Sequence, residues 1–218
     1  MHRIFLFFSL TSLVLALLTG CQRQDVSELR SQSVNSETTE TEKPTPPDRT
    51  ETEIKSEPEP TFQVISPAFE EDETVPVRYT CEGDNISPAL SWSNVPDAAK
   101  ELALICDDPD APAGTWVHWI VFHIPPDTTG LPENFPLDEE LPSGIRQGVT
   151  SFQTIGYGGP CPPRGRGVHH YLFKLYALDT ELSLKPGATK EELLTAMEGH
   201  ILAETQLIGE FERVDSGN

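Results

Sequence analysis

The sequence places most of its large apolar residues in short runs that proline and glycine separate. Five such runs are rich in β-branched and aromatic side chains: TFQVI, VPVRY, LALIC, WVHWIVFHI and YLFKLYAL. Short runs bounded by turn residues are typical of β-strands. Several runs are apolar at nearly every position, as expected of strands that are covered on both faces. The pattern predicts a mostly β domain, and a sandwich of two sheets in particular.

One stretch, PGATKEELLTAMEGH, has helical character instead. Thr189 is a candidate N-cap and Glu192 follows three residues later, which is the spacing of a capping box. Leu193, Leu194 and Met197 then form an apolar stripe at helical spacing. The next segment, ILAETQLIGEFER, roughly alternates in character. We therefore expect one helix near the C-terminus, followed by a last strand.

The N-terminal residues predict export. A mostly apolar run from Ile4 to Leu18 has the length of a signal-peptide core and is short for a membrane span. It leads into LTGC, which resembles the lipobox of bacterial lipoproteins; an ordinary signal peptide or a short anchor helix is the alternative. In the lipoprotein interpretation residues 1–20 are removed and Cys21 is acylated. The protein is then a membrane-anchored lipoprotein of the cell envelope, and Gln22 after the cysteine indicates the outer membrane if the host is Gram-negative.

Residues 21–60 predict a disordered tether, because they are rich in Ser, Thr, Glu and Pro and have almost no large apolar residue. Such a segment cannot bury enough surface to offset the entropy of ordering it. The folded domain is therefore expected at residues 61–218. The chain has 15 Lys and Arg against 35 Asp and Glu, a formal net charge of −20. Nucleic acid is excluded as a partner, because its binding requires a basic face.

Three cysteines remain for an oxidising compartment once Cys21 is lipidated. Cys106 ends the apolar run LALIC and is predicted to be a buried strand thiol. Cys81 and Cys161 both lie in turn segments that contain glycine. The sequence leaves two alternatives for this pair, a disulfide or two free thiols. A bridge would contribute roughly 4–5 kcal/mol in the chain-entropy description.

Polar and aromatic residues recur with the spacing i and i+2 at the ends of apolar runs. In an extended chain, residues with this spacing point to the same side. If the strands are neighbours, these side chains converge at one rim of the sheet, where ligand sites are common. The pairs are Asp108 and Asp110, Trp116 and His118, and His169 and Tyr171.

Each pair also has a structural interpretation. Asp108 and Asp110 could form an Asx-turn, and His118 could be a hydrogen-bonded core histidine. The functional interpretation depends on their coincidence with the bend GYGGPCPPRGRGVHHY, whose glycines allow close backbone approach to an anion. Arg164 and Arg166 add positive charge in this bend. Together with the carboxylates, these residues predict a pocket for a phosphorylated or zwitterionic group such as phosphoethanolamine.

Several segments resemble the phosphatidylethanolamine-binding protein (PEBP) family, in particular its bacterial and archaeal Raf-kinase-inhibitor-like branch: NISPALSW, DDPDAP, WVHWIVFHIPPD, GYGGPCPPRGRGVHHYLFKLYALD and GATKEELLTAMEGHILAETQLIGEF. The resemblance covers nearly all of residues 61–218. It implies a two-sheet β-sandwich with a small anion-binding cavity at one end. Carried over by motif, the ligand-binding residues are Asp108, Asp110, Trp116, His118, Tyr157, Gly158, Pro162, Pro163, His169 and Tyr171.

The chain departs from this family at several positions. Many members have Asn-Asp before the aromatic residue that precedes GYGGPCPP, where this chain has Thr150-Ser151-Phe152. That change affects the expected shape of one pocket wall. Asn is common in the family at the position of His123, and Arg at that of His170.

The function expected from these observations is a membrane-tethered binding module for phosphate, phosphoethanolamine or a lipid headgroup. One alternative is an inhibitor or scaffold that binds a protein kinase or protease, as the family name suggests. A less favoured alternative is a hydrolase that uses Cys161 as a thiolate or an Asp/His site. HExxH, GxSxG and phosphate-loop motifs are absent from the sequence. We therefore expect no enzymatic activity, no cofactor and no metal ion.

Overall fold

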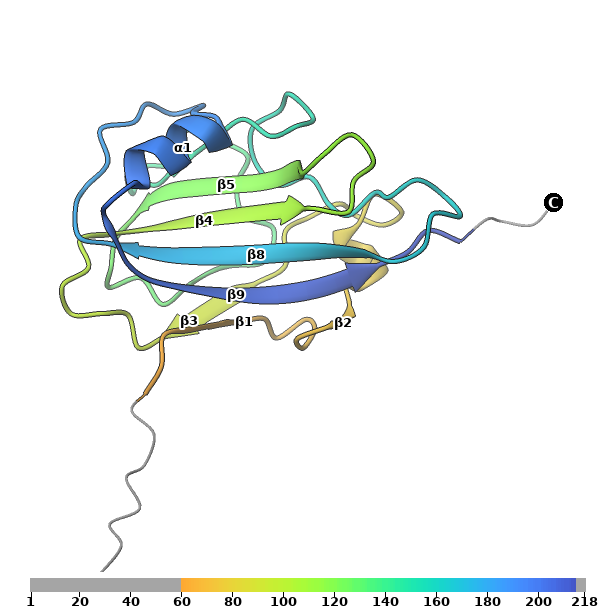
Figure 1. The fold of residues 1–218 in the computed structure, drawn as a ribbon, viewed down its shortest axis with the longest axis horizontal. Helices are drawn as coiled ribbons and strands as arrows, with labels where there is room; N and C mark the ends of the chain where they lie inside the picture. Colours follow the sequence, from red (N-terminus) through yellow and green to blue (C-terminus); the bar gives the residue numbers. More distant parts are fainter. Residues whose placement is uncertain (1–59, 215–218) are drawn as a thin grey trace, which may run out of the picture. The chain divides into compact units, whose positions relative to one another are not determined.

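The computed structural model describes residues 60–214, in which two β-sheets form the framework (Figure 1). The predicted signal peptide, Cys21 and nearly all of the tether lie outside the described residues. In chain order the elements are β1 (Gln63–Ile65), β2 (Glu73–Thr74), the 3-10 helix η1 (Val77–Tyr79), β3 (Leu90–Ser93), β4 (Glu101–Asp108), β5 (Trp116–Ile124), β6 (Gly130–Leu131), β7 (Arg146–Gln147), β8 (His169–Leu178), α1 (Lys190–Met197) and β9 (Ile201–Phe211).

The small sheet has the strand order β1-β3-β6, and the large sheet has the order β2-β9-β8-β4-β5-β7. All neighbouring strands are antiparallel except β2 and β9, which run parallel. The predicted mostly β fold with two sheets and a single helix is thus confirmed. The order places β4 between β5 and β8, so the end of β4 lies beside the beginnings of both neighbours. This arrangement positions the candidate site.

The large sheet is covered on both faces. Its inner face packs on the small sheet through side chains such as Leu104, Trp119 and Phe173, and its outer face packs on α1 through Leu193 and Met197. Strand β4 is consequently buried at every position. This explains why its sequence is almost continuously apolar rather than alternating. The predicted buried thiol, Cys106, lies in this strand, and burial raises its pKa well above the ordinary value.

The predicted helix and last strand are confirmed. The side chain of Thr189 accepts a hydrogen bond from the Glu192 N–H, and the Glu192 carboxylate accepts one from the Thr189 N–H, so the capping box is complete. Leu193 and Met197 are buried, whereas Leu194 is 40% exposed. The buried stripe is therefore narrower than the sequence pattern indicated. Strand β9 follows directly and pairs with β8 along its length.

One predicted strand, VPVRY, is wrong: Val77–Tyr79 form the 3-10 helix η1. Pro76 lacks an N–H, so the segment cannot continue a regular ladder. The chain turns instead, with hydrogen bonds from the Tyr79 N–H to the Pro76 carbonyl and from the Thr80 N–H to the Val77 carbonyl. The turn brings Tyr79 and the following loop toward the end of the large sheet, where the candidate site lies.

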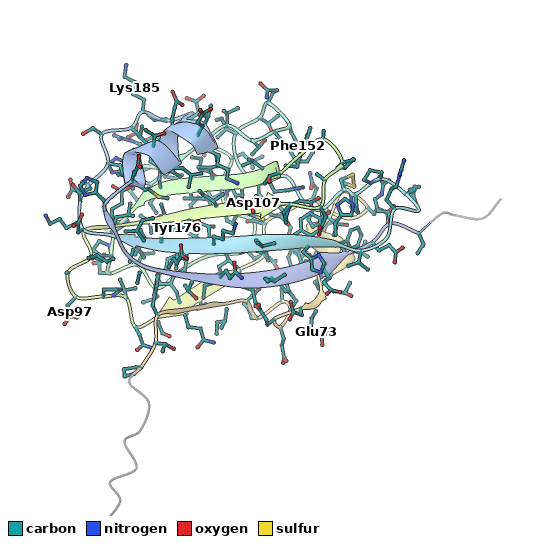
Figure 2. All side chains as sticks on the ribbon, in the orientation of Figure 1. Glu73, Asp97, Asp107, Phe152, Tyr176 and Lys185 are labelled. Atoms are coloured by element: carbon teal, nitrogen blue, oxygen red, sulfur yellow. A yellow bond between two sulfur atoms is a disulfide. The ribbon has the colours of Figure 1, made fainter. Side chains whose placement is uncertain are left out.

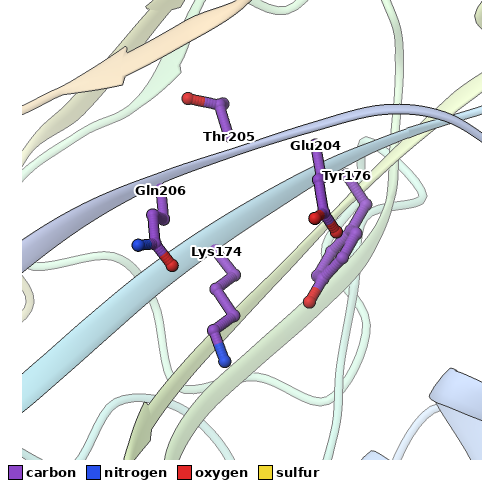
Figure 3. Close-up of a pocket in the computed structure, with 5 residues that line it drawn as sticks. All are labelled: Lys174, Tyr176, Glu204, Thr205 and Gln206. Atoms are coloured by element: carbon purple, nitrogen blue, oxygen red, sulfur yellow. The ribbon is translucent and has the colours of Figure 1, made fainter.

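Ion pairs connect α1 to the outer face of the large sheet. Asp107 is 1% exposed and its carboxylate pairs with Lys174 on β8 and Lys190 on α1. Lys174 also borders a shallow hollow of about 270 Å³ on this face (Figure 3), whose other lining residues are Tyr176, Glu204, Thr205 and Gln206. Among residues 60–214, no helix has the length and apolar character that crossing a bilayer requires.

Candidate functional site

A cavity of about 270 Å³ lies at the end of the large sheet where β4 ends and where β5 and β8 begin. Figure 2 labels Phe152 at this end. Most of the lining is apolar, and a few polar side chains converge in it, which is the usual composition of a small-molecule site. The lining residues are Asp108, Ala111, Pro112, Ala113, Trp116, His118, Phe152, Cys161, Pro162, Pro163 and His169.

A buried Asp–His pair forms one polar side of the cavity. The Nδ1–H of His169 donates to Asp108 Oδ2 at 2.8 Å, and both side chains are only 5% exposed. The other carboxylate oxygen of Asp108 accepts the backbone N–H of Asp110 at 2.8 Å, so the expected Asx-turn is present as well. Asp108 therefore serves the turn and the cavity together. Because the carboxylate holds a proton on Nδ1 of His169, Nε2 is the ring atom that can meet a ligand.

His118 lines the same cavity, but its Nδ1 has a backbone carbonyl as its partner instead of a carboxylate. Its Nδ1 lies 2.6 Å from the carbonyl oxygen of Gly158, and because a carbonyl only accepts, Nδ1 carries the proton. Burial lowers the pKa of His118, although the bond to Gly158 and the charge of Asp108 oppose the shift. The ring is thus neutral at pH 7 and its Nε2 is a hydrogen-bond acceptor. The backbone N–H of Gly158 donates back to the His118 carbonyl at 2.9 Å, which fixes the loop to β5.

Aromatic rings surround His118. The ring of Phe152 packs edge-on against Trp116 and His118, with centroid distances of 5.4 and 5.3 Å, and Tyr171 packs against His118 at 5.1 Å. Tyr171 is fully buried, and burial raises the pKa of its phenol. Its hydroxyl makes no hydrogen bond of ordinary geometry with the described residues, although it lies near the backbone of Cys161.

The structure separates some of the residues that the sequence grouped together. Asp110 is 41% exposed and binds His170 instead of facing the cavity. Tyr157 lies in the core between the sheets, where its hydroxyl donates to the Tyr79 carbonyl at 2.9 Å. Gly158 and Tyr171 stand behind His118 rather than in the lining. Of the ten predicted ligand-binding residues, six line the cavity: Asp108, Trp116, His118, Pro162, Pro163 and His169.

The two arginines of the bend do not line the cavity. Arg164 pairs with Glu82 and donates to the Val214 carbonyl, on the outside of the loop. The structure therefore does not place these charges in the cavity lining. The polar groups that the cavity offers come from Asp108, His118 and His169 instead.

Five lining residues were not among the predicted ligand-binding residues: Ala111, Pro112, Ala113, Phe152 and Cys161. From the sequence, the last two have other predicted roles, Phe152 at a pocket wall and Cys161 as a candidate nucleophile. The first three follow Asp108 in the loop after β4, within or next to the DDPDAP motif, and their apolar character was the available signal. Phe152 belongs to the segment that departs from the family pattern. The hydroxyl of Ser151 beside it accepts the Val117 N–H at 2.9 Å, and this bond fixes the segment to β5.

A disulfide joins Cys81 to Cys161 across 80 residues of sequence. It connects the loop after η1 with the loop that carries GYGGPCPP, and two hydrogen bonds reinforce the connection. The Cys81 N–H donates to the Pro160 carbonyl at 3.1 Å, and the Gly159 N–H donates to Asn85 Oδ1 at 2.8 Å. Because its sulfur is in this bridge, Cys161 is not a free thiolate nucleophile, which removes one of the hydrolase alternatives. Within residues 60–214, no group of three or more His, Cys, Asp and Glu side chains is arranged to hold a metal ion.

Comparisons with known proteins agree with this architecture. The family model described as phosphatidylethanolamine-binding protein matches residues 65–212. A UPF0098 protein of Methanothermobacter thermautotrophicus is 60% identical over 146 residues, covering 67% of this chain and 95% of the relative. A Mycobacterium tuberculosis protein named "Putative lipoprotein LppC" is 42% identical over 149 residues, covering 68% of this chain and 71% of that protein.

Two solved structures show the same fold. Escherichia coli YbcL, described as a member of the mammalian PEBP family, is 35% identical with a TM-score of 0.65, and the match covers 69% of this chain and 98% of YbcL. The PEBP homologue CT736 of Chlamydia trachomatis is 43% identical with a TM-score of 0.64, and the match covers 70% of this chain and 97% of CT736.

Proposed function

The chain belongs to the phosphatidylethanolamine-binding protein family, and on this basis we propose that its end cavity binds a small phosphorylated group. The buried Asp108–His169 pair beside His118 is the observation that carries the proposal. Two imidazoles and a carboxylate in a small, mostly apolar space have hydrogen-bonding capacity that the protein itself does not use up.

The two histidines offer complementary groups to a phosphate. The neutral His118 has a bare Nε2, which can accept a hydrogen bond from a protonated phosphate oxygen. His169, oriented by Asp108, can donate from Nε2 to a second phosphate oxygen when that nitrogen is protonated. A group that both donates and accepts, such as a phosphate monoanion, therefore fits better than a fully ionised anion.

The rest of the cavity suits the remainder of such a ligand. Trp116, Phe152 and Pro163 provide apolar surface for a short ester chain, as in phosphoethanolamine or a lipid headgroup. The carboxylate of Asp108 disfavours a second negative charge. The two sources of the same chemistry, a lipid headgroup or a free phosphorylated metabolite, differ in whether a longer chain continues beyond the cavity mouth.

Titration calorimetry with inorganic phosphate, phosphoethanolamine and a short-chain phosphatidylethanolamine tests this proposal. We expect saturable binding that His118→Ala and His169→Ala each weaken at least about tenfold, the loss of one or more hydrogen bonds to a charged group. His200→Ala is the matched control, because His200 pairs with Asp179 near the opposite end of β8. Equal affinity in all four proteins would show that this cavity is not the binding site.

We also propose that the domain acts while tethered to a membrane by Cys21. The LTGC segment and the lipoprotein name of one relative support this part. Cys21→Ala is expected to move the protein from the membrane fraction to the soluble fraction of the producing cell. Retention of the Cys21→Ala protein in the membrane fraction would contradict the lipid anchor.

A further inference from the structure

An exposed disulfide forms part of the cavity wall. Cys161 lines the cavity, and both Cys161 and its partner Cys81 are exposed to solvent. Exposed disulfides exchange with external thiols more readily than buried ones, because the attacking thiolate must reach a sulfur atom. The position of this bridge therefore differs from that of a purely structural crosslink in a core.

The charges around the two sulfur atoms are unequal. Arg213 is 23% exposed, and its Nη1 lies 3.6 Å from the sulfur of Cys161. Its Nε donates to Glu82 at 3.0 Å, and this bond is the first cause of the lowered pKa of the Glu82 carboxyl. Glu82 directly follows Cys81 in the sequence. A guanidinium thus stands beside one sulfur, and a carboxylate adjoins the other residue.

We propose that the Cys81–Cys161 bridge is a thiol–disulfide exchange site, at which a dithiol reductant attacks Cys81 and Cys161 leaves. A thiolate with a nearby positive charge is the better leaving group. Arg213 supplies that charge at Cys161. Arg164 also pairs with Glu82, so the carboxylate is largely neutralised and does not repel the incoming thiolate.

The exchange runs in two steps. One thiol of the reductant loses its proton to solvent, and its sulfur bonds to the Cys81 sulfur. The bridge breaks, and Cys161 leaves with the electron pair as a thiolate beside Arg213. The second thiol of the reductant then gives up its proton and attacks its partner sulfur in the mixed disulfide, and Cys81 leaves and takes up a proton. The reductant ends as a disulfide, and two electrons have passed to the protein.

Reduction changes one cavity wall without removing the other contacts that hold it. The hydrogen bonds of Gly158 to His118 and of Gly159 to Asn85 do not involve the sulfur atoms, so we expect them to persist after reduction. A thiolate at Cys161 adds negative charge to the lining, which disfavours a bound anion. On the proposed function, on which this step rests, we therefore expect reduction to weaken phosphate binding about threefold or more.

The position of the mixed disulfide tests the exchange in the wild-type protein itself. The oxidised exported protein is treated briefly with reduced glutathione, quenched with acid, alkylated and mapped by peptide mass spectrometry. We expect the glutathione adduct on Cys81 and the alkyl group on Cys161. Adducts on Cys161, or equal amounts on the two cysteines, would overturn the assignment.

The rate of reduction by dithiothreitol tests the role of Arg213. Arg213→Gln is expected to slow reduction about threefold to tenfold, as a leaving group with a higher pKa does. Arg78→Gln is the matched control, because Arg78 lies three residues before Cys81 and pairs with Asp84 and Glu133 rather than with Glu82; its rate should change less than about twofold. Circular dichroism establishes that both variants are folded. Equal rates in the two variants, or reduction only as fast as global unfolding in urea, would show a structural crosslink only.

The two proposals fail in different ways. If oxidised wild-type protein does not bind phosphate, the proposed function is wrong, and the adduct position still decides the exchange site. If oxidised and reduced proteins bind phosphate equally, the exchange site is not coupled to the cavity. If phosphate binds and its affinity falls on reduction, both proposals are supported.

Discussion

Two adjacent glycines in GYGGPCPP are expected to respond very differently to substitution by alanine. Neither Gly158 nor Gly159 has a positive φ, so the backbone of both positions allows a side chain. Space alone decides the outcome. A Cβ at Gly158 would lie 2.7 Å from the ring of Phe152, whereas a Cβ at Gly159 would lie 2.2 Å from the carbonyl oxygen of Tyr79.

The loss of stability in each variant depends on whether the neighbouring group can move away from the new Cβ. Phe152 is 39% exposed, so its ring can rotate outward and lose edge contacts of about 0.5–1.5 kcal/mol. Replacing glycine by alanine restores about 0.4–1 kcal/mol through the unfolded state, so Gly158→Ala should cost at most about 1 kcal/mol. The Tyr79 carbonyl is part of the backbone and cannot move aside. Overpacking and loss of the Gly159–Asn85 hydrogen bond should together cost about 2–4 kcal/mol in Gly159→Ala.

Urea unfolding of the oxidised proteins, followed by tryptophan fluorescence, measures both free energies of unfolding. Parallel transitions with equal slopes establish that the two variants unfold from comparable native states. The reasoning is refuted if the two variants differ by less than about 0.5 kcal/mol, or if Gly158→Ala is the less stable one. The affinity of the Gly158→Ala protein for phosphate should also differ from that of the wild type, because the ring of Phe152 that must move packs against His118.

Three further predictions concern the rest of the domain. Burial lowers the pKa of His118, so its contribution to stability is present above the ordinary pKa and is lost as pH falls through the lowered value. His118→Gln should therefore flatten the fall in the free energy of unfolding between neutral and acid pH. An unchanged pH profile would contradict this. Asp107→Asn leaves Lys174 and Lys190 without their buried partner and should lower the free energy of unfolding by about 2–4 kcal/mol, measured by chemical denaturation. A smaller loss would show that these ion pairs do not stabilise the contact between α1 and the sheet. Thr189→Ala removes the cap of α1 and should cost about 1 kcal/mol, most visibly as faster amide exchange in α1.

The sequence predicted the elements better than the loops. The capping box at Thr189 and the buried strand β4 follow from local patterns that the tertiary structure does not change. The i, i+2 argument held for one pair, held in part for a second and failed for the third. His169 and Tyr171 both lie in β8, but only His169 lines the cavity, because Tyr171 packs against His118. Trp116 and His118 both lie in β5 and share the cavity, whereas β4 ends at Asp108, so Asp110 no longer follows the alternation and faces His170.

Long-range pairing is the part of the site that local patterns could not supply. Nothing near Arg164 in the sequence indicates that its partner is Glu82, which lies 82 residues away. The loss of Arg164 from the cavity and the closeness of Arg213 to Cys161 both depend on how β9 returns beside β8. The register of these strands decides which charges meet, and that register is fixed by the packing of the whole sheet.

The cavity has one wall in the interior of the fold and one wall at its periphery. Asp108 ends a strand that is buried at every position and hydrogen-bonded to neighbours on both sides, whereas Cys161 lies in an exposed loop. In deuterium exchange, the amides of β4 should therefore open only with global unfolding, and those of the mostly exposed residues 164–168 through local fluctuations. A ligand larger than the resting cavity would enter by displacement of the loop wall, against a β4 wall that does not yield. The size limit of this site is thus set by the loop.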